Sequence, residues 1–187
     1  MNAEPTPPLW PLHPTEDARL EDLRSLEMMD TPNEEPYDGI VEVAAALFET
    51  PIALLTLLDS ERQWFKASVG VPVCSTHRAD ALCNHTIIGS KTLVVNDTTR
   101  DHRFKDHRFV VGEPHLRFYA GTPLISDREQ AVGTLCVLDV RPREFDAARY
   151  RLLERLARQA VEALESRRLI QTLLSQCIET EGRAVVR

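Results

Sequence analysis

The run Arg117-Phe118-Tyr119-Ala120-Gly121-Thr122-Pro123-Leu124 is followed, after a short polar segment, by Gly133-Thr134-Leu135-Cys136-Val137-Leu138-Asp139, and these two runs decide the fold. Bulky, aromatic and β-branched residues dominate both, which predicts two β-strands. The segment from Ile125 to Gln130 is typical of a tight turn, so we expect an antiparallel hairpin. Side chains alternate along a strand, and polar side chains on a packed strand need partners. The hairpin therefore indicates a pocket on one of its faces.

The composition is that of an ordinary globular protein. The chain has 187 residues, of which 43% are hydrophobic and 27% charged, enough for one domain with a real core. The net charge of −7 and the lack of a basic stripe argue against nucleic acid as a partner. No apolar run is long enough to span a membrane, and the N-terminus lacks a secretion signal, so we expect a cytoplasmic protein. Its four cysteines (Cys74, Cys83, Cys136 and Cys177) are then expected to be reduced thiols.

The remaining elements follow from periodicity and from helix-ending residues. Residues 1–14 contain five prolines and are expected to be a disordered arm. After the hairpin, Asp146 is expected to cap a long helix that runs to about Thr180. Between the arm and the hairpin, the pattern predicts a helix capped by Thr15, a helix over 34–49, strands over 52–58 and 63–69, a helix from Asp80 to about Gly89, a strand over 93–95, and a partly helical cover over 101–109.

Several short motifs occur in one fixed order along the chain. They are Asp30-Thr31-Pro32, Pro51-Ile52-Ala53, Arg62-Gln63-Trp64-Phe65-Lys66, Cys83-Asn84-His85-Thr86-Ile87, Val94-Val95-Asn96-Asp97, Asp101-His102-Arg103-Phe104 and the hairpin. Together, over about residues 20–165, they resemble GAF domains of the bacterial sensory type, which lie N-terminal in sensor histidine kinases and diguanylate cyclases. The resemblance implies an α+β fold: a central antiparallel sheet of five or six strands, with helices on one face and a loop-covered pocket on the other. We accordingly divide the chain into the arm (1–14), a GAF domain (15–165) and a C-terminal helix extension with a tail (166–187).

GAF domains sense small molecules of many kinds, so the ligand has to be argued from the residues. Arg117 could clamp an anion, and Tyr119 could offer its hydroxyl. Register places Cys136 on the same side of the hairpin as Tyr119. The candidate ligand-binding residues are Trp64, Cys83, His85, Asp97, Phe104, Arg117, Tyr119, Thr134 and Cys136.

Structural roles compete with these assignments. Tyr119 can be a core aromatic with a satisfied hydroxyl, and the two central cysteines can be small buried residues. Trp64 and Phe65 lie on opposite faces of one strand, so one belongs to the core and the other lies under a loop. Arg117 can instead pair with a carboxylate, and those near it in sequence are Asp97, Asp101 and Glu113.

A metal site and two ligand classes are not expected. Cys83 and His85 could be joined by a further histidine, but the spacing fits no closed zinc pattern. Residues 98–116 contain no cysteine to which a bilin could attach. The signature of cyclic-nucleotide GAF domains cannot be aligned with this chain. The identity of any cofactor is left open. The histidines considered as further metal ligands are His102, His107 and His115.

An enzymatic function is also not expected. Free methionine-sulfoxide reductase uses cysteines in the GAF fold, and Cys74, Cys83 and Cys136 invite comparison with it. Its His-Ile-Ala-Cys-Asp stretch is absent from this chain, and no hydrolase-like set or Gly-rich phosphate loop is present.

The long C-terminal helix predicts a homodimer. Its second half carries Ile170, Leu173, Leu174 and Ile178 beyond a compact domain, and a second copy would cover them, helped by residues 16–29. The alternative is a tail that folds back or frays. The predicted seam, with alternating spacings of three and four, is Leu153, Leu156, Ala160, Ala163, Arg167, Ile170, Leu174 and Cys177.

We therefore expect a non-enzymatic GAF domain that senses a small molecule and signals through a dimer helix to a histidine kinase or diguanylate cyclase. A dimerisation module with a vestigial pocket is the alternative. The sequence contains no output domain, so the sensor either acts on a separate partner or belongs to a longer protein.

Overall fold

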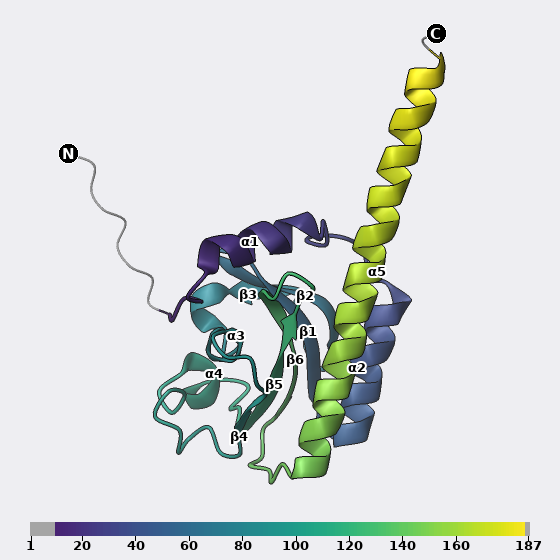
Figure 1. Cartoon of the computed structure of the whole chain (residues 1–187). Coiled ribbons are helices and arrows are strands. Elements are labelled where there is room, and N and C mark those ends of the chain that lie inside the picture. Colours follow the sequence, from purple (N-terminus) through teal and green to yellow (C-terminus); the bar gives the residue numbers. More distant parts are fainter. Residues whose placement is uncertain (1–9, 186–187) are drawn as a thin grey trace, which may run out of the picture.

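A computed structural model describes residues 10–185, with side chains described as far as residue 178 (Figure 1). Within this part of the chain, one six-stranded sheet has the order β3-β2-β1-β6-β5-β4, with every neighbouring pair antiparallel. This confirms the predicted α+β fold and the hairpin. The strands are β1 (Ile52–Leu58), β2 (Arg62–Val69), β3 (Ser75–His77), β4 (Leu93–Val95), β5 (Phe118–Ile125) and β6 (Ala131–Asp139).

Helices divide between the two faces of the sheet. Figure 1 shows α2 and α5 side by side on one face, α3 and α4 on the other, and α1 across one end of the strands. No helix of the described residues is long and apolar enough to cross a membrane. The helices are α1 (Glu16–Ser25), α2 (Glu35–Phe48), α3 (Asn84–Ile87), α4 (Arg108–Val111) and α5 (Ala147–Val185), with a 3-10 helix at Arg78–Asp80.

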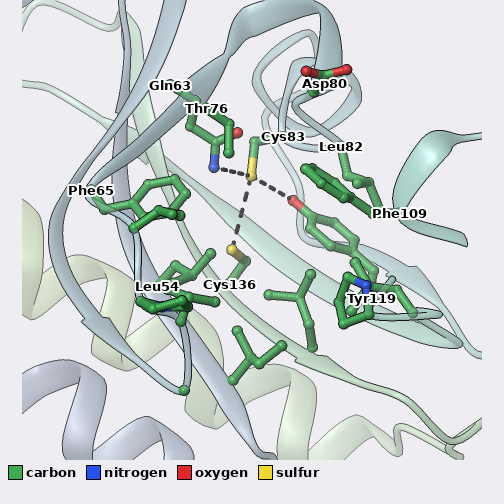
Figure 2. Close-up of a pocket in the computed structure, with 18 of the residues that line it drawn as sticks. Leu54, Gln63, Phe65, Thr76, Asp80, Leu82, Cys83, Phe109, Tyr119 and Cys136 are labelled. Carbon is green, nitrogen blue, oxygen red and sulfur yellow. Dashed lines mark hydrogen bonds between the residues drawn. The ribbon is translucent and has the colours of Figure 1, made fainter. Parts of the chain in front are cut away.

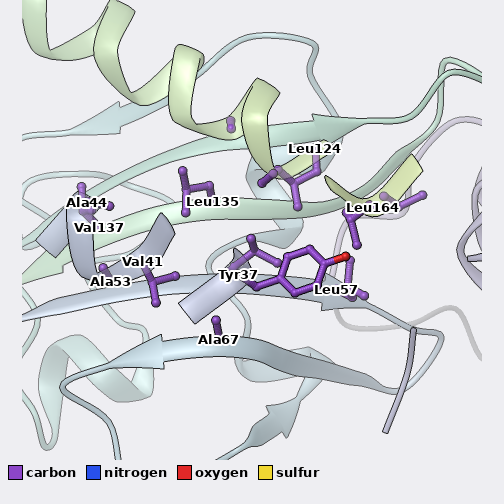
Figure 3. Close-up of a cluster of buried hydrophobic side chains, with 14 of the residues drawn as sticks. Tyr37, Val41, Ala44, Ala53, Leu57, Ala67, Leu124, Leu135, Val137 and Leu164 are labelled. Atoms are coloured by element: carbon purple, nitrogen blue, oxygen red, sulfur yellow. The ribbon is translucent and has the colours of Figure 1, made fainter. Parts of the chain in front are cut away.

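The main core lies between the sheet and helices α2 and α5 (Figure 3). Tyr37 and Val41 from α2 point onto β1 and β2, and Leu164 from α5 lies near Leu124 at the end of β5. On α5 the buried stripe is Leu153, Ala157, Ala160 and Leu164. Leu156 and Ala163 of the predicted seam are only partly buried beside this stripe, so the seam was wrong by one residue at these two positions.

Strands β5 and β6 are buried on both faces. Phe118 and Leu135 face the helices, whereas Tyr119 and Cys136 belong to a second apolar cluster on the opposite face. Consecutive residues of a strand point to opposite faces. The surface on which α5 packs and the second cluster are therefore separated only by the thickness of the sheet.

Two fully buried arginines fasten α1 to the end of the sheet. Arg19 Nη1 donates to the carbonyl of Leu58 at the end of β1 (2.6 Å). Arg19 and Arg78 both pair with the Glu16 carboxylate, at 2.6 and 2.5 Å. Burial raises the pKa of Glu16, but the hydrogen bonds from Arg19 and Arg78 outweigh it and lower this pKa to about 2. The cluster stays charged at neutral pH.

Arg78 also shapes the segment that was predicted to be a helix from Asp80 to Gly89. Its Nε donates to Asn84 Oδ1 (3.0 Å), and Asn84 Nδ2 donates back to the Arg78 carbonyl (2.6 Å). Asp80 pairs with Arg108 (2.8 Å) and does not act as the predicted cap. The segment therefore folds as a 3-10 turn followed by the short α3, with Cys83 just before that helix.

Two other predicted caps had different outcomes. Thr15 precedes α1, but its side chain makes no capping hydrogen bond, because its hydroxyl donates to Gln130 Oε1 (2.9 Å). Asp146 does cap α5, since its Oδ1 accepts from the Arg149 N–H (2.8 Å). Of the predicted arm, residues 1–9 lie outside the described residues, and Trp10 packs edge-on against His77.

The second half of α5 extends away from the domain, as Figure 1 shows at the yellow end of the chain. Five large apolar side chains there are each more than half exposed. Residues 16–29 were predicted to contribute to the same dimer surface. Leu20, Leu23 and Leu26 cannot do so, because these leucines are buried in the main core. The exposed residues are Leu169, Ile170, Leu173, Leu174 and Ile178.

Candidate functional site

A cavity of about 330 Å³ lies on the face of the sheet opposite α2 and α5 (Figure 2). Strands β1, β2, β5 and β6 form its floor, and the segments around 70–73, 80–83 and 109–116 cover it. Most of its lining is apolar. The floor side chains are Ile52, Leu54, Gln63, Phe65, Tyr119, Cys136 and Leu138.

The lining carries no positive charge among the described residues. Its two acidic members are Asp80, which Arg108 neutralises at 2.8 Å, and Glu113, whose side chain is 91% exposed. Recognition of a carboxylate or phosphate normally uses Arg, Lys or a set of N–H donors. The cavity therefore suits a neutral, mainly apolar molecule better than an anion.

The polar part of the cavity centres on one sulfur atom. The Cys83 Sγ accepts hydrogen bonds from Gln63 Nε2 (3.5 Å), Tyr119 Oη (3.4 Å) and Thr134 Oγ1 (3.0 Å). The Cys136 Sγ lies 3.9 Å away. Figure 2 shows Gln63, Tyr119 and Cys136 converging on this sulfur from different strands.

Two further threonines support these donors. Thr86 Oγ1 lies 2.6 Å from Tyr119 Oη, and Thr56 Oγ1 lies 2.9 Å from Thr134 Oγ1. When Tyr119 and Thr134 donate to the sulfur, the two outer threonines can donate to them in turn. Hydrogen bonds arranged in such chains strengthen one another in a dry environment.

This network favours the thiolate of Cys83. Burial raises the pKa of the Cys83 thiol, but hydrogen bonds from Cys136, Thr134 and Tyr119 outweigh it and lower this pKa to about 7. The pKa of Cys136 moves up, because its thiol donates to Cys83 and is buried. Burial, followed by the Cys83 charge, also raises the pKa of Tyr119. Of these three groups, Cys83 is therefore the one that loses its proton first, while Cys136 and Tyr119 stay neutral donors.

Three of the nine predicted ligand residues line the cavity: Cys83, Tyr119 and Cys136. The last two lie on one face of the hairpin, in agreement with the register argument. Tyr119 is also the satisfied core aromatic considered as its alternative, since its hydroxyl is buried and hydrogen-bonded. Thr134 lies behind Cys83 and contacts it without lining the cavity.

Trp64 lies on the wrong side of the sheet for the predicted role. It is buried in the main core, with Lys66 Nζ 5.9 Å from its ring centre. Its neighbours Gln63 and Phe65 line the cavity instead, because side chains alternate along β2. The alternation identified the two possibilities, but the main core takes the larger ring.

His85 and Phe104 contact each other beside the cavity but do not line it. Their rings meet edge to face at 4.9 Å, and Phe104 in turn lies 6.3 Å from the Tyr119 ring. Burial lowers the pKa of His85. Its ring therefore acts as packing behind the tyrosine.

Asp97 and Arg117 also lie outside the lining. Asp97 accepts a hydrogen bond from the Thr99 hydroxyl (2.6 Å) within its own loop. Arg117 Nη1 donates to the carbonyls of Val110 and Leu116, both at 2.9 Å. Carbonyls at the end of a helix lack partners within the helix, which explains why α4 takes this guanidinium. Backbone carbonyls thus hold Arg117 outside the cavity lining, and, after the hydrogen bond from Thr99, its positive charge is among the causes that lower the pKa of Asp97.

No group of three or more His, Cys, Asp or Glu side chains within the described residues is arranged to hold a metal ion. Other lining residues were not predicted from the sequence, namely Gln63, Leu82 and the apolar side chains of β1 on the cavity floor. Gln63 was detectable, because alternation places it on the same face of β2 as Phe65, where a covered polar side chain needs a buried partner.

Comparisons with known proteins agree with this geometry. The GAF domain family model matches residues 32–164, and the chain belongs to the GAF family. A cyclic di-GMP phosphodiesterase of Pseudomonas aeruginosa is 38% identical over 155 residues, which is 81% of this chain and 26% of that protein. The chain thus spans about a quarter of that relative. Its similarity places the chain among signalling GAF domains.

Two solved structures show how widely the fold is used. The GAF domain of the Acinetobacter phosphoenolpyruvate-protein phosphotransferase is 18% identical, with a TM-score of 0.60 over 83% of this chain and 98% of its own. The free methionine-R-sulfoxide reductase of Neisseria meningitidis, solved with its substrate, is also 18% identical, with a TM-score of 0.60 over 86% and 98%. At this identity the likeness establishes the fold alone.

Proposed function

We propose that this chain is the regulatory, small-molecule-sensing GAF domain of a bacterial signalling protein, and that it acts through binding and not through turnover. The observation that carries the proposal is the 330 Å³ cavity, a volume within the usual range of ligand sites. Its floor includes β5 and β6, and α5 packs against the other face of these two strands. A molecule that shifts these strands would also shift the surface on which α5 packs.

The ligand is a neutral and mainly apolar molecule with one polar group. Leu54, Phe65 and Leu138 offer it apolar contacts, and the thiol, phenol and amide around Cys83 offer it hydrogen-bond partners. An anion would lose its hydration without gaining a cationic partner, which costs several kcal/mol. This reasoning disfavours cyclic nucleotides and carboxylates.

The output is a homodimer formed through the exposed second half of α5. Ile170 and Leu174 are 57% and 58% exposed and are four residues apart, on one side of the helix. A second copy of the same helix would cover them in the manner of a coiled coil. Histidine kinase, diguanylate cyclase or phosphodiesterase modules are the proposed partners, the last by analogy with the Pseudomonas relative.

Thermal unfolding with matched ligand pairs tests this function. The probes are hexanol against hexanoate and benzyl alcohol against benzoate, with cyclic di-GMP and cyclic AMP included. A neutral compound at a hundredfold excess over its Kd should stabilise the fold by about 2.7 kcal/mol. The anionic member of each pair should give a much smaller shift.

Two variants provide the control. Leu138→Trp fills the cavity floor and should abolish the shift, whereas Leu47→Trp, on the exposed side of α2, should preserve it. If the anions stabilise as well as the neutral compounds, the ligand class is wrong. If no compound in a wider neutral library shifts the chain while the dimer persists, the domain is a dimerisation module with a vestigial pocket.

A further inference from the structure

Two thiols face each other inside the cavity, and the proposed function uses them only as polar contacts. The Sγ atoms of Cys83 and Cys136 are 3.9 Å apart, and both residues are almost completely buried yet line the cavity. They come from different parts of the fold, the segment before α3 and the middle of β6. The other two cysteines, Cys74 and Cys177, are exposed.

A disulfide requires a sulfur separation of about 2.05 Å, so the two atoms must approach by about 1.9 Å. Cys83 precedes a helix of only four residues, in a segment covering the sheet, whereas Cys136 is fixed in a central strand between β1 and β5. Rotation of the Cys83 side chain and a small shift of its segment can supply the approach. The two cysteines are therefore reduced thiols in contact, close enough to form a disulfide after this small movement.

We propose that Cys83 and Cys136 form an oxidisable dithiol that reacts with an organic hydroperoxide entering the cavity, with Cys83 as the attacking sulfur and Cys136 as the resolving one. The three hydrogen-bond donors that converge on Cys83 stabilise it as a thiolate, the form that attacks peroxides. The apolar lining favours an alkyl hydroperoxide over more polar oxidants. The inference uses the proposed ligand cavity but does not require that another ligand be sensed there.

The oxidation of the two thiols takes two steps. The Cys83 thiolate attacks the terminal oxygen of the hydroperoxide, an S–O bond forms, the O–O bond breaks, and the alkoxide leaves as an alcohol after taking a proton from solvent. Cys83 is then a sulfenic acid. The Cys136 sulfur attacks the Cys83 sulfur, the S–S bond forms, the S–O bond breaks, and the hydroxyl leaves as water with the Cys136 proton. Two thiols are oxidised by two electrons, and the hydroperoxide is reduced to an alcohol and water.

Oxidation would change the cavity floor. A disulfide sulfur carries no negative charge and is a poor acceptor, so Tyr119 and Thr134 lose the partner to which they now donate. Their hydroxyls lie on β5 and β6, the strands that also contact α5. The modification therefore acts on the same output element as a bound ligand.

The test uses the full chain with Cys74→Ser and Cys177→Ser, so that only the buried pair remains. The protein is treated with tert-butyl hydroperoxide, quenched in acid and alkylated with N-ethylmaleimide under denaturing conditions. Its mass is then measured by intact-protein mass spectrometry. We expect the mass to fall by the two hydrogens lost, no alkylation, and a Cys83–Cys136 cross-linked peptide. The rate should rise with pH around pH 7, following the Cys83 thiolate.

Single variants assign the two roles. Cys136→Ser should stop at a sulfenic acid on Cys83 that dimedone traps, and Cys83→Ser should slow oxidation by about tenfold or more. Circular dichroism melts confirm that each variant is folded. Two alkylated thiols after excess hydroperoxide would overturn the proposal, and so would equal reactivity of the Cys83→Ser variant. A disulfide formed by hydrogen peroxide but not by the alkyl hydroperoxide would overturn the oxidant class. None of these readouts depends on the ligand screen, so the two proposals fail separately.

Discussion

Tyr119 lies along its own strand with its hydroxyl directly over Gly121. A Cβ atom at position 121 would stand 2.2 Å from Tyr119 Oη and 2.6 Å from its Cζ. The two residues point to the same face of β5, so only a glycine leaves room for the ring. The hydrogen bond from Tyr119 to Cys83 thus depends on a missing methyl group two residues away.

Gly121→Ala should therefore displace the phenol and destabilise the fold by about 1–3 kcal/mol, since a rigid ring has to move within a packed cluster. Urea unfolding measures the loss. Gly39→Ala is the matched control, because a Cβ there meets nothing within 4 Å and removes a glycine from the interior of α2. The control should be more stable by about 0.5–1 kcal/mol. Equal effects of the two changes would contradict the proposed crowding.

Removing only the hydroxyl isolates its effect on the sulfur. Tyr119→Phe deletes one donor to the Cys83 thiolate, which should raise the pKa of Cys83 by about one unit and slow its reaction at neutral pH by about fivefold. The measurement is the pH dependence of N-ethylmaleimide labelling of Cys83 in the variant without exposed cysteines. Tyr37→Phe removes a hydroxyl from the opposite face of the sheet and should leave the profile unchanged.

Acid should weaken the attachment of α1. The folded-state pKa of Glu16 is about 2, below its ordinary value of 4.5, so its contribution to stability is complete above about pH 4.5 and is lost as the pH falls towards 2. Glu16→Gln should cost about 3–5 kcal/mol at pH 7, because two buried arginines lose their shared carboxylate. It should also flatten the pH dependence of the unfolding free energy over that window.

Glu21→Gln, an exposed substitution on the same helix, is the control for this measurement and should change stability by less than about 0.5 kcal/mol. If Glu16→Gln retains the full acid sensitivity of the parent chain between pH 4.5 and 2, other carboxylates are responsible.

Charged side chains on the exposed second half of α5 should prevent two copies of the chain from associating. Ile170→Glu with Leu174→Glu should convert the proposed dimer to a monomer in light scattering at micromolar concentration, with the melting temperature of the domain core little changed. Glu154→Gln and Glu162→Gln alter charge on the same helix without touching this surface. A parent chain that is monomeric at these concentrations contradicts the dimer.

The sequence predicted the sheet, the hairpin and the long helix because each depends on local patterns that tertiary contacts reinforce. It predicted less of the site. Alternation shows that Trp64 and Phe65 face opposite ways. Each ring has a buried polar neighbour from β2, Lys66 beside Trp64 and Gln63 beside Phe65, so nothing local says which side the helices cover. Arg117 was misplaced for another reason: its partners are backbone carbonyls, which carry no signature in the sequence.

The packing of α5 has a mechanical consequence. The helix is clamped to β5 and β6 over Leu153–Leu164, while its last twenty or so residues extend about 30 Å past that anchor at 1.5 Å per residue. A tilt of about 10° at this anchor would move the far end sideways by about 5 Å, because the extension is about 30 Å long. The helix can thus act as a lever that pivots at the back of the cavity floor. In the proposed dimer, a displacement too small to disturb the sheet would change the distance between the far ends of the two helices by several ångströms.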